Sequence, residues 1–152
     1  MRLFATRFAS RAVPAALLTA ALTACGSGIS LDEPIEGPVW RLTQLGAGQP
    51  LPPGGDLQRD PQVQFDSSGR VSGSGGCNRV SGSFTRSGSE LRIGQLAATR
   101  MACADPARGA TESEFFVALQ TTASYRLQGP GRLALLDAGG RTLATLQSGA
   151  GR

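Results

Sequence analysis

The sequence contains neither histidine nor lysine, and all 15 basic residues among its 152 are arginine. Without lysine there is no Walker-type phosphate loop, no Schiff base and no Ser-x-x-Lys nucleophile. Without histidine there is no Ser-His-Asp or Cys-His pair and no histidine-based zinc site. Catalysis would have to depend on carboxylate pairs, Tyr125, free thiols or hydroxyls. These absences predict a protein that is not an enzyme and that holds neither a cofactor nor a metal.

Positive charge is also scarcer than the formal charge of +4 suggests. Arg2, Arg7 and Arg11 lie in the first 24 residues, which contain no acid, and without them 12 arginines face 11 acids. The other arginines are spread singly along the chain. Nucleic-acid binding proteins carry a basic patch or run, so we expect no nucleic-acid partner.

The longest apolar run, AVPAALLTAALTA at residues 12–24, is too short to span a bilayer, which needs about 20 residues. It suits the apolar core of a signal peptide. The run ends in Leu22-Thr23-Ala24-Cys25, which resembles the lipobox L-x-[AG]-C of bacterial lipoproteins. This resemblance implies that residues 1–24 are a lipoprotein signal peptide and that Cys25 carries acyl chains such as palmitate. It also implies a lipid-anchored envelope protein, at the periplasmic face of the outer membrane because no Asp follows Cys25.

Export changes how the other cysteines are interpreted. With Cys25 committed to lipid, Cys77 and Cys103 remain in an oxidising compartment. A disulfide between them would close a loop of about 27 residues and stabilise the fold by about 3.6 kcal/mol. The alternatives are a metal pair or a reactive thiol, but two sulfurs with no histidine or further cysteine make a poor zinc site. We therefore expect a disulfide.

Composition divides the mature chain into three parts. Residues 25–38 contain three acids and two prolines without a period, which is typical of a flexible tether. Residues 39–147 form one domain of ordinary size, and residues 148–152 a disordered C-terminal tail. Within the domain, apolar and polar residues alternate in short segments with a turn every 8 to 12 residues, beginning with residues 39–45. This spacing predicts an antiparallel meander.

One helix interrupts the strands. Residues 111–114, Thr-Glu-Ser-Glu, match a capping box in which Thr111 caps the helix and Glu114 reaches back. An earlier start at Asp105 is the alternative, and Gly109 weakens it. The order of strands, one helix and strands predicts an α+β fold, a single small domain whose antiparallel sheet is covered by the helix.

Residues 71–84 and 98–103 are the most distinctive part of the chain. Together with an early W-x-L they closely resemble the META domain, the HslJ-like family of envelope and heat-shock-associated proteins. The family pattern also includes G-x-x-G-C-N-x-x-x-G-x-[FY], T-x-M-x-C and E-x-x-[FLY]-x-x-x-L. Its positions here are Trp40 and Leu42; Gly73, Gly76, Cys77, Asn78, Gly82 and Phe84; Thr99, Met101 and Cys103; and Glu112 with Phe116, followed by Leu119 or Gln120.

The resemblance covers residues 39–147. It implies a small α+β domain in the periplasm or at the membrane, an association with stress response or drug tolerance, and no established catalytic activity. It supplies no catalytic residues.

The loop at Gly75, Gly76, Asn78 and Arg79 has two interpretations. The favoured one is a tight turn or bulge that brings Cys77 to Cys103, because a turn explains each residue type there. The functional one is a nest of backbone amides that binds an anion, helped by Arg79.

Three acids, Asp105, Glu112 and Glu114, lie close together in the sequence. A glycosidase needs two carboxyl groups about 5 to 9.5 Å apart. Acids in the first turn of a helix also stabilise its dipole, and this capping role is the better explanation.

The leading hypothesis is a non-enzymatic, lipid-anchored periplasmic protein that supports envelope stress or drug tolerance by binding a protein or a cell-wall component. The second is an inhibitor of a lysozyme or protease, acting through the Gly/Pro-rich residues 46–60. The third is an enzyme that cleaves cell-wall sugar through the acids above.

Overall fold

The computed structural model describes residues 34–52 and 59–149 of the chain. The predicted signal peptide at residues 1–24 and the predicted lipidation site Cys25 lie outside these ranges. In the part of the chain that is described, no helix is long and apolar enough to span a membrane.

The described residues form nine strands and one helix. In chain order these are β1 (Val39–Leu45), β2 (Gln62–Phe65), β3 (Arg70–Ser74), β4 (Arg79–Ser87), β5 (Glu90–Ile93), β6 (Ala97–Ala98), α1 (Pro106–Thr121), β7 (Ser124–Leu127), β8 (Arg132–Leu136) and β9 (Thr142–Ser148). All the strand pairs are antiparallel. The predicted α+β class, with one helix on an antiparallel sheet, is confirmed.

The sheet closes on itself into a barrel. Its strands follow the order β3-β2-β1-β9-β8-β7-β5-β4, and β3 also pairs with β4, which completes the ring. The long strand β4 makes this possible, because residues 79–83 pair with β3 and residues 84–87 pair with β5. The short strand β6 lies outside the ring, on the other edge of β4 opposite Val80 and Ser81. Ring closure leaves few free sheet edges.

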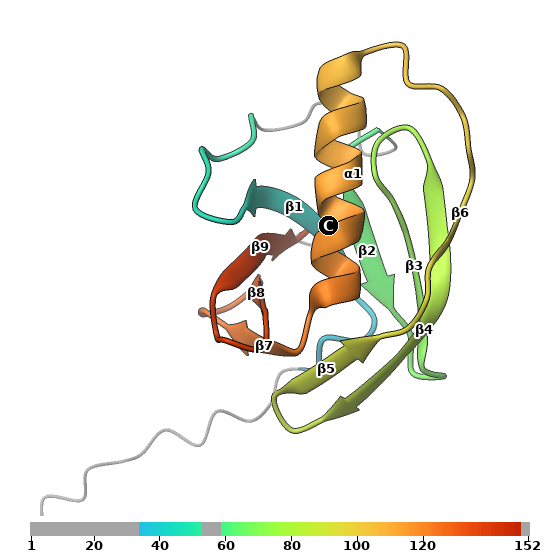
Figure 1. Ribbon diagram of the computed structural model, residues 1–152. Coiled ribbons are helices and arrows are strands. Elements are labelled where there is room, and N and C mark those ends of the chain that lie inside the picture. Colours follow the sequence, from blue (N-terminus) through green and yellow to red (C-terminus); the bar gives the residue numbers. More distant parts are fainter. Residues whose placement is uncertain (1–33, 53–58, 150–152) are drawn as a thin grey trace, which may run out of the picture. The chain divides into compact units, whose positions relative to one another are not determined.

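The core lies between the barrel and the helix. Alternate residues of the strands point inward, as the sequence pattern predicts, and α1 lies across the strands in Figure 1. Phe65 and Phe84 meet edge to face with ring centroids 5.0 Å apart, and the helix adds Phe115 and Leu119, which are fully buried. The fully buried large residues are Trp40, Phe65, Phe115, Ile35, Leu91, Leu119, Leu133, Leu135, Leu146, Val63 and Val71.

The helix begins earlier than the capping box predicts. Its N-cap is Asp105, whose side chain accepts a hydrogen bond of 2.9 Å from the backbone N–H of Ala107, and Pro106 takes the first helical position. Thr111 lies inside the helix, where its hydroxyl donates to the carbonyl of Ala107. The prediction that Thr111 caps the helix is therefore wrong, and the alternative start at Asp105 is the one the structure has.

The domain extends further at both ends than composition predicts. Ile35 is fully buried, and its carbonyl accepts a 2.7 Å hydrogen bond from Nε1 of Trp40. Glu36 forms a bridge with Phe65 and an ion pair of 2.9 Å with Arg86. Residues 35–38 therefore belong to the domain, and the predicted tether boundary at residue 38 is wrong. Ser148 ends β9, so it does not belong to a tail either.

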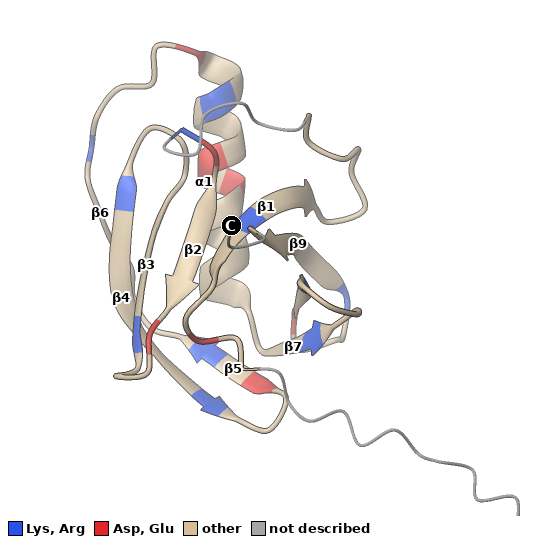
Figure 2. Cartoon of the chain, turned by 180° about the vertical axis from the view of Figure 1, so that it is seen from behind, with Lys and Arg blue, Asp and Glu red and all other residues tan. Residues whose placement is uncertain are grey.

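Charged side chains are distributed singly over the described surface. Figure 2 shows basic and acidic residues at scattered positions on the strands, the turns and the helix.

Two hairpin turns use the same arrangement around an aspartate. Asp66 accepts hydrogen bonds from the Ser68 hydroxyl and from the backbone N–H groups of Ser68 and Arg70. Asp137 accepts from the backbone N–H groups of Gly139 and Arg141 and from the Arg141 side chain. These bonds, led by the Ser68 hydroxyl at Asp66 and by the Arg141 backbone at Asp137, hold the pKa of both carboxyls below their ordinary value.

This geometry predicts how acid affects stability. A lowered pKa means that both ionised carboxylates stabilise the fold above the unfolded value of 3.8, and that the stabilisation is lost as the pH falls through the folded values. Asp66→Asn combined with Asp137→Asn should lower the free energy of unfolding at neutral pH, and the difference from the wild type should vanish in acid. Urea unfolding over a pH series measures it. A difference that stays constant across the series would contradict the assignment, and Glu114→Gln is the matched control.

Candidate functional site

Six residues of the family pattern meet at one end of the barrel. They come from the β3–β4 turn, from the segment that follows β6, and from the second turn of α1. We call them the signature cluster: Cys77, Asn78, Thr99, Met101, Cys103 and Glu112.

Glu112 lies at the centre of the signature cluster. Glu112 is only 6% exposed. Its carboxylate accepts hydrogen bonds from the backbone N–H of Cys77 (2.9 Å), the backbone N–H of Asn78 (2.6 Å) and Nδ2 of Asn78 (2.6 Å). Glu112, Phe115 and Leu119 share one face of α1 because they are spaced i, i+3 and i+7. The helix therefore inserts a carboxylate along the same stripe that it uses to fill the core.

Asn78 connects this carboxylate to the segment after β6. Its Oδ1 accepts from the Thr99 hydroxyl (2.9 Å) and from the backbone N–H of Met101 (2.6 Å), while Nδ2 also donates to the carbonyl of Met101 (3.1 Å). With a residue exposure of 7%, the side chain is buried and uses both its donor and acceptor groups. Asn78 thus holds the backbone of Met101 at both its N–H and its carbonyl.

Cys77 and Cys103 form a disulfide with an S–S distance of 2.08 Å. The bond joins the same two segments that Asn78 holds together. Sγ of Cys103 lies 4.0 Å from Oε1 of Glu112. A disulfide sulfur has no proton, so this approach is a contact and not a hydrogen bond.

Gly75 makes room for the carboxylate. A Cβ atom at this position would lie 2.6 Å from Oε2 and 2.8 Å from Cδ of Glu112. Gly76 next to it has φ of +109°, a conformation that side chains rarely adopt. Glycine is therefore required at position 75 because the Glu112 side chain occupies the space of a Cβ atom, and at position 76 because the backbone has a positive φ.

The predicted anion nest is already filled from within the chain. The amides of Cys77 and Asn78 donate to Glu112, the amide of Gly75 donates to the carbonyl of Asn78, and that of Gly76 donates to the Ser74 hydroxyl. The anion at this loop is the Glu112 carboxylate. The hypothesis that Gly75, Gly76, Asn78 and Arg79 together bind an external anion is therefore wrong.

The assignment of the acids also changes. Glu112 does not act at the helix N-terminus, since Asp105 caps it and Glu112 lies in the second turn. When Glu112 takes the first position of the family pattern E-x-x-[FLY]-x-x-x-L, Phe115 takes the aromatic position and Leu119 the last one, and both are fully buried. The earlier assignment of the half-buried Phe116 to the aromatic position is wrong. An acid in register with the apolar stripe was the feature of the sequence that could have identified Glu112 as buried.

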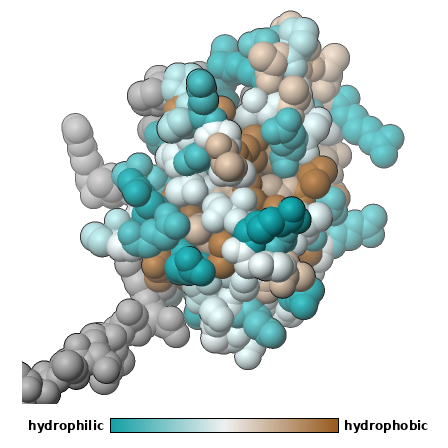
Figure 3. All heavy atoms as spheres, turned by 60° about the vertical axis from the view of Figure 1, so that its left-hand side comes forward, coloured by the Kyte–Doolittle hydropathy of each residue, from teal (hydrophilic) through white to brown (hydrophobic). Residues whose placement is uncertain are grey.

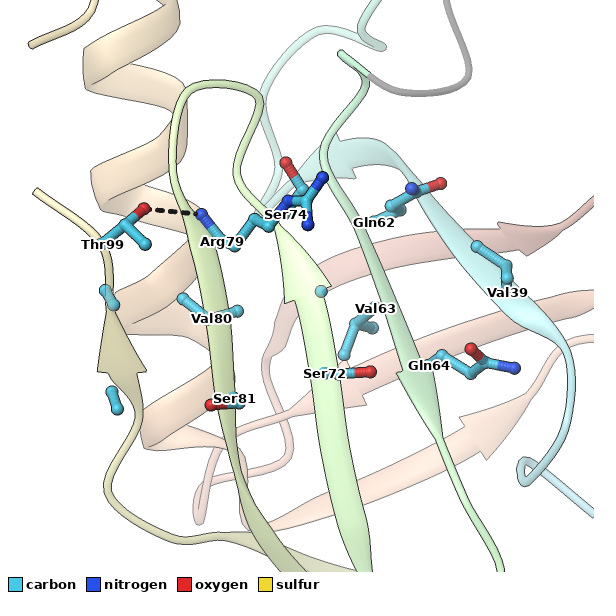
Figure 4. A pocket seen from close by; sticks show the side chains of 13 residues that line it. Val39, Gln62, Val63, Gln64, Ser72, Ser74, Arg79, Val80, Ser81 and Thr99 are labelled. Carbon is cyan, nitrogen blue, oxygen red and sulfur yellow. Dashed lines mark hydrogen bonds between the residues drawn. The ribbon is translucent and has the colours of Figure 1, made fainter. Parts of the chain in front are cut away.

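Beside the signature cluster, the outer face of the barrel forms a shallow hollow of ≈ 790 Å³. Its floor consists of outward side chains of β2, β3 and β4, and β6 and Val39 form its sides (Figure 4). We call this surface the polar face: Gln62, Gln64, Ser72, Ser74, Arg79 and Ser81. The side chains of Gln62, Ser72 and Ser81 make no hydrogen bond with any described residue, so their polar groups are available to a ligand.

Arg79 connects the signature cluster to the polar face. Its backbone N–H donates to the Thr99 hydroxyl (3.0 Å), and its side chain is exposed and extends toward Ser74 in Figure 4. Among the described residues, no carboxylate forms an ion pair with its guanidinium. The polar face therefore presents one uncompensated positive charge among neutral hydrogen-bonding groups.

A second hollow, of ≈ 1060 Å³, lies over the outer faces of β1, β8 and β9. Arg141 and Asp137 on its border pair with each other at 2.7 Å. On the side of the molecule seen in Figure 3, hydrophobic residues occur in small groups between hydrophilic ones, with no broad apolar surface. The second hollow differs from the polar face in containing this ion pair, although its Gln128, Arg132 and Gln147 side chains make no hydrogen bond with a described residue.

Comparison with known proteins confirms the resemblance to the META domain that the sequence motifs indicate. The family model described as the META domain matches residues 33–150. No curated protein matches the chain.

Three solved structures share the fold. An NMR structure of a protein from Burkholderia xenovorans is 26% identical, with a TM-score of 0.60 over 77% of this chain and 85% of that one. A second protein with an NMR structure is 28% identical, with a TM-score of 0.58 over 74% of this chain and 90% of that one. A DUF4847 family protein from Bacteroides vulgatus is 16% identical, with a TM-score of 0.54 over 78% of this chain and 96% of that one, a likeness of fold alone.

The bonds of Glu112 predict the effect of an isosteric change. In Glu112→Gln, whichever way the amide turns, its NH₂ group faces an N–H donor of Cys77 or Asn78. We expect the free energy of unfolding to fall by about 2–3 kcal/mol, measured by chemical denaturation. The exposed Glu114→Gln should change it by less than about 0.5 kcal/mol. Equal effects of the two substitutions would refute the central role of Glu112.

The approach of Gly75 to Glu112 predicts a coupling between the two positions. Gly75→Ala should destabilise the fold by about 1–3 kcal/mol because the new methyl group displaces the carboxylate. The same substitution made in a Glu112→Ala background should cost much less, since the obstructed group is gone. Gly149→Ala, in open space, is the control. Strict additivity in this double-mutant cycle would show that the contact does not determine the requirement for glycine.

Proposed function

Because the chain belongs to the META domain family, we propose that it is a non-enzymatic, lipid-anchored periplasmic protein that supports the envelope under stress or drug exposure by binding another envelope component. The single observation that carries the proposal is the polar face, a hollow lined by neutral polar side chains and by Arg79, whose guanidinium forms no ion pair with any residue that the structure describes. Binding through this face requires no catalytic group.

The positions of the acids support binding rather than catalysis. The Glu112 carboxylate is buried and occupied by three hydrogen bonds, and Asp105 caps the helix. A glycosidase acid or nucleophile must face its substrate. Neither of these carboxylates belongs to the polar face.

The composition of the polar face favours a protein over a sugar polymer as the partner. All the aromatic residues in the described ranges are buried or half-buried, so none offers an exposed ring on which a sugar could stack. Serine hydroxyls and glutamine amides suit the peptide groups of an extended segment, and Arg79 suits an acidic side chain. We therefore expect an extended polypeptide segment that carries an acidic residue.

The predicted anchor limits where the partner lies. Only residues 26–33 separate Cys25 from the first described residue, and a chain of this length reaches at most about 30 Å. The domain would stay close to the membrane, so a partner at or near the membrane surface is favoured.

A hydrolase inhibitor is the second candidate. The loop that follows β1 is attached at two points, by the amide of Gly46 to the carbonyl of Leu143 and by the amide of Leu51 to the carbonyl of Thr43, both at 2.8 Å. An attached loop loses little entropy when it binds a partner. Residues 53–58 of this loop lie outside the described ranges.

Two negative charges placed on the polar face test the proposal. Ser72→Glu combined with Ser81→Glu, in the lipid-anchored chain, should repel an acidic partner from Arg79. Partners cross-linked in the envelope fraction are identified, and the affinity of each purified partner is measured. We expect the variant to bind its partner at least about tenfold more weakly, which corresponds to about 1.4 kcal/mol.

The matched control adds the same charge elsewhere, with Thr85→Glu and Ser113→Glu, and should bind as the wild type does. Equal affinity of the polar-face variant and the control would refute binding at this face. A captured hydrolase whose inhibition is unaffected by either pair of substitutions would favour the inhibitor instead.

A further inference from the structure

Three side chains suited to a metal ion converge beneath the surface of the signature cluster. The Sγ atoms of Cys77 and Cys103 and a carboxylate oxygen of Glu112 all lie within 4.8 Å of one another. They come from three different segments of the chain. A groove of ≈ 480 Å³, lined also by Met101 and Arg108, gives solvent access to both cysteines. The sequence predicted a poor zinc site because only two cysteine sulfurs were available, and the fold adds Glu112 as a third possible ligand.

The two sulfurs are held together by more than the disulfide. Asn78 holds Met101, two residues before Cys103, at both backbone groups, and Glu112 holds the amide of Cys77. Cys103 also packs on the helix, where a Cβ atom at Gly109 would lie 3.6 Å from its Sγ. None of these contacts requires the S–S bond. The two thiols therefore remain neighbours when that bond is opened.

The carboxylate has capacity for a metal. Oε1 accepts one hydrogen bond, from Nδ2 of Asn78, so one of its lone pairs remains. Tetrahedral zinc with Zn–S of about 2.3 Å and Zn–O of about 2.0 Å separates its sulfur and oxygen ligands by about 3.5 Å. Oε1 and Sγ of Cys103 are 4.0 Å apart, which is close to this separation. Once the S–S bond is opened, the two sulfurs must also move apart to about 3.8 Å to occupy two tetrahedral positions.

We infer that the reduced protein binds one zinc ion through Cys77, Cys103 and Glu112, and that formation of the disulfide releases it. A dithiol reductant supplies two electrons and two protons: the S–S bond breaks, Cys77 and Cys103 become thiols, and the dithiol becomes a disulfide. Zn²⁺ then displaces the two thiol protons and binds both thiolates and Oε1. In the reverse direction a small-molecule disulfide accepts two electrons from the two thiolates and two protons from solvent, becomes a dithiol, and the re-formed Cys77–Cys103 disulfide releases Zn²⁺. The fourth position faces the groove and takes a water molecule.

The charge and the softness of the ligands favour zinc. Two thiolates and a carboxylate leave a net charge of −1 around Zn²⁺. The same groove is lined by Arg59, Arg108 and Asp105, two positive groups and one negative group, which favours this net charge. Thiolate ligands exclude Mg²⁺ and Ca²⁺, which require oxygen. None of these ligands belongs to the polar face, so the test of the zinc site and the test of the proposed function are independent.

The test uses the full chain with Cys25→Ser, which leaves Cys77 and Cys103 as its two cysteines. The protein is reduced with a phosphine, which does not bind zinc as a thiol would, and titrated with Co²⁺ as a spectroscopic substitute. We expect thiolate-to-cobalt charge-transfer absorption that saturates at one ion per chain, and its loss on addition of Zn²⁺. The oxidised protein should show no such absorption.

Variants identify the ligands. Cys77→Ser with Cys103→Ser should abolish the absorption, and Glu112→Gln should weaken zinc binding by about tenfold or more. Glu114→Gln is the matched control and should bind as the wild type does. Circular dichroism checks that each variant is folded, and the cysteine variants decide the matter if Glu112→Gln does not fold.

Three results with a folded protein would overturn the site. These are a folded, reduced protein that takes up no cobalt, uptake that persists without both cysteines, and equal uptake by the oxidised protein. If reduction unfolds the chain, Zn²⁺ must restore the native circular dichroism spectrum, and a chain that stays unfolded with zinc also overturns it.

Discussion

One buried carboxylate determines the arrangement of the signature cluster. Glu112 projects from the core-facing stripe of α1 and accepts three hydrogen bonds from Cys77 and Asn78, 35 and 34 residues earlier in the chain. A charge removed from water destabilises a fold by several kcal/mol unless it is fully bonded. The surrounding residues satisfy this condition: Gly75 leaves space for the carboxylate, the β3–β4 turn presents two amides to it, and Asn78 adds a third donor. Helix, turn and the segment after β6 are therefore fixed relative to one another.

The segment after β6 is attached twice, and the two attachments act differently. The disulfide limits the unfolded chain and stabilises mainly through entropy, while the Asn78 side chain specifies the conformation of residues 99–101 through directed hydrogen bonds. The first can be removed by a reductant, and the second cannot. This difference is why opening the disulfide need not release the segment, and it is the physical basis for a binding site that depends on the redox state.

Local sequence patterns were sufficient to predict the strands, but they could not predict features that depend on residues far away in the chain. Alternation at residues 39–45 predicted β1 with its observed bounds, because the inward face of a strand is visible in its own sequence. Closure of the ring by β3 and β4 and the burial of Glu112 depend on residues far away in the chain. The helix start was predicted wrongly because Thr111 and Asp105 both look like caps locally. Residues 35–38 resembled a tether because one apolar residue, Ile35, shows no period, although it fills the core beside Trp40.

The family pattern describes a scaffold more than a ligand. Gly76, Cys77, Asn78, Cys103 and Glu112 all have structural partners within the chain, so their presence says how the domain is held together. The outward residues of β2 and β3, such as Gln62 and Ser72, are not part of that pattern, and a different set could stand on the same strands without disturbing the core. Arg79 connects the two: its backbone N–H donates to Thr99 of the signature cluster, and its side chain belongs to the polar face. The scaffold therefore fixes the position of residue 79 on the strand, and under the proposed function the neighbouring side chains of β2 and β3 would select the partner.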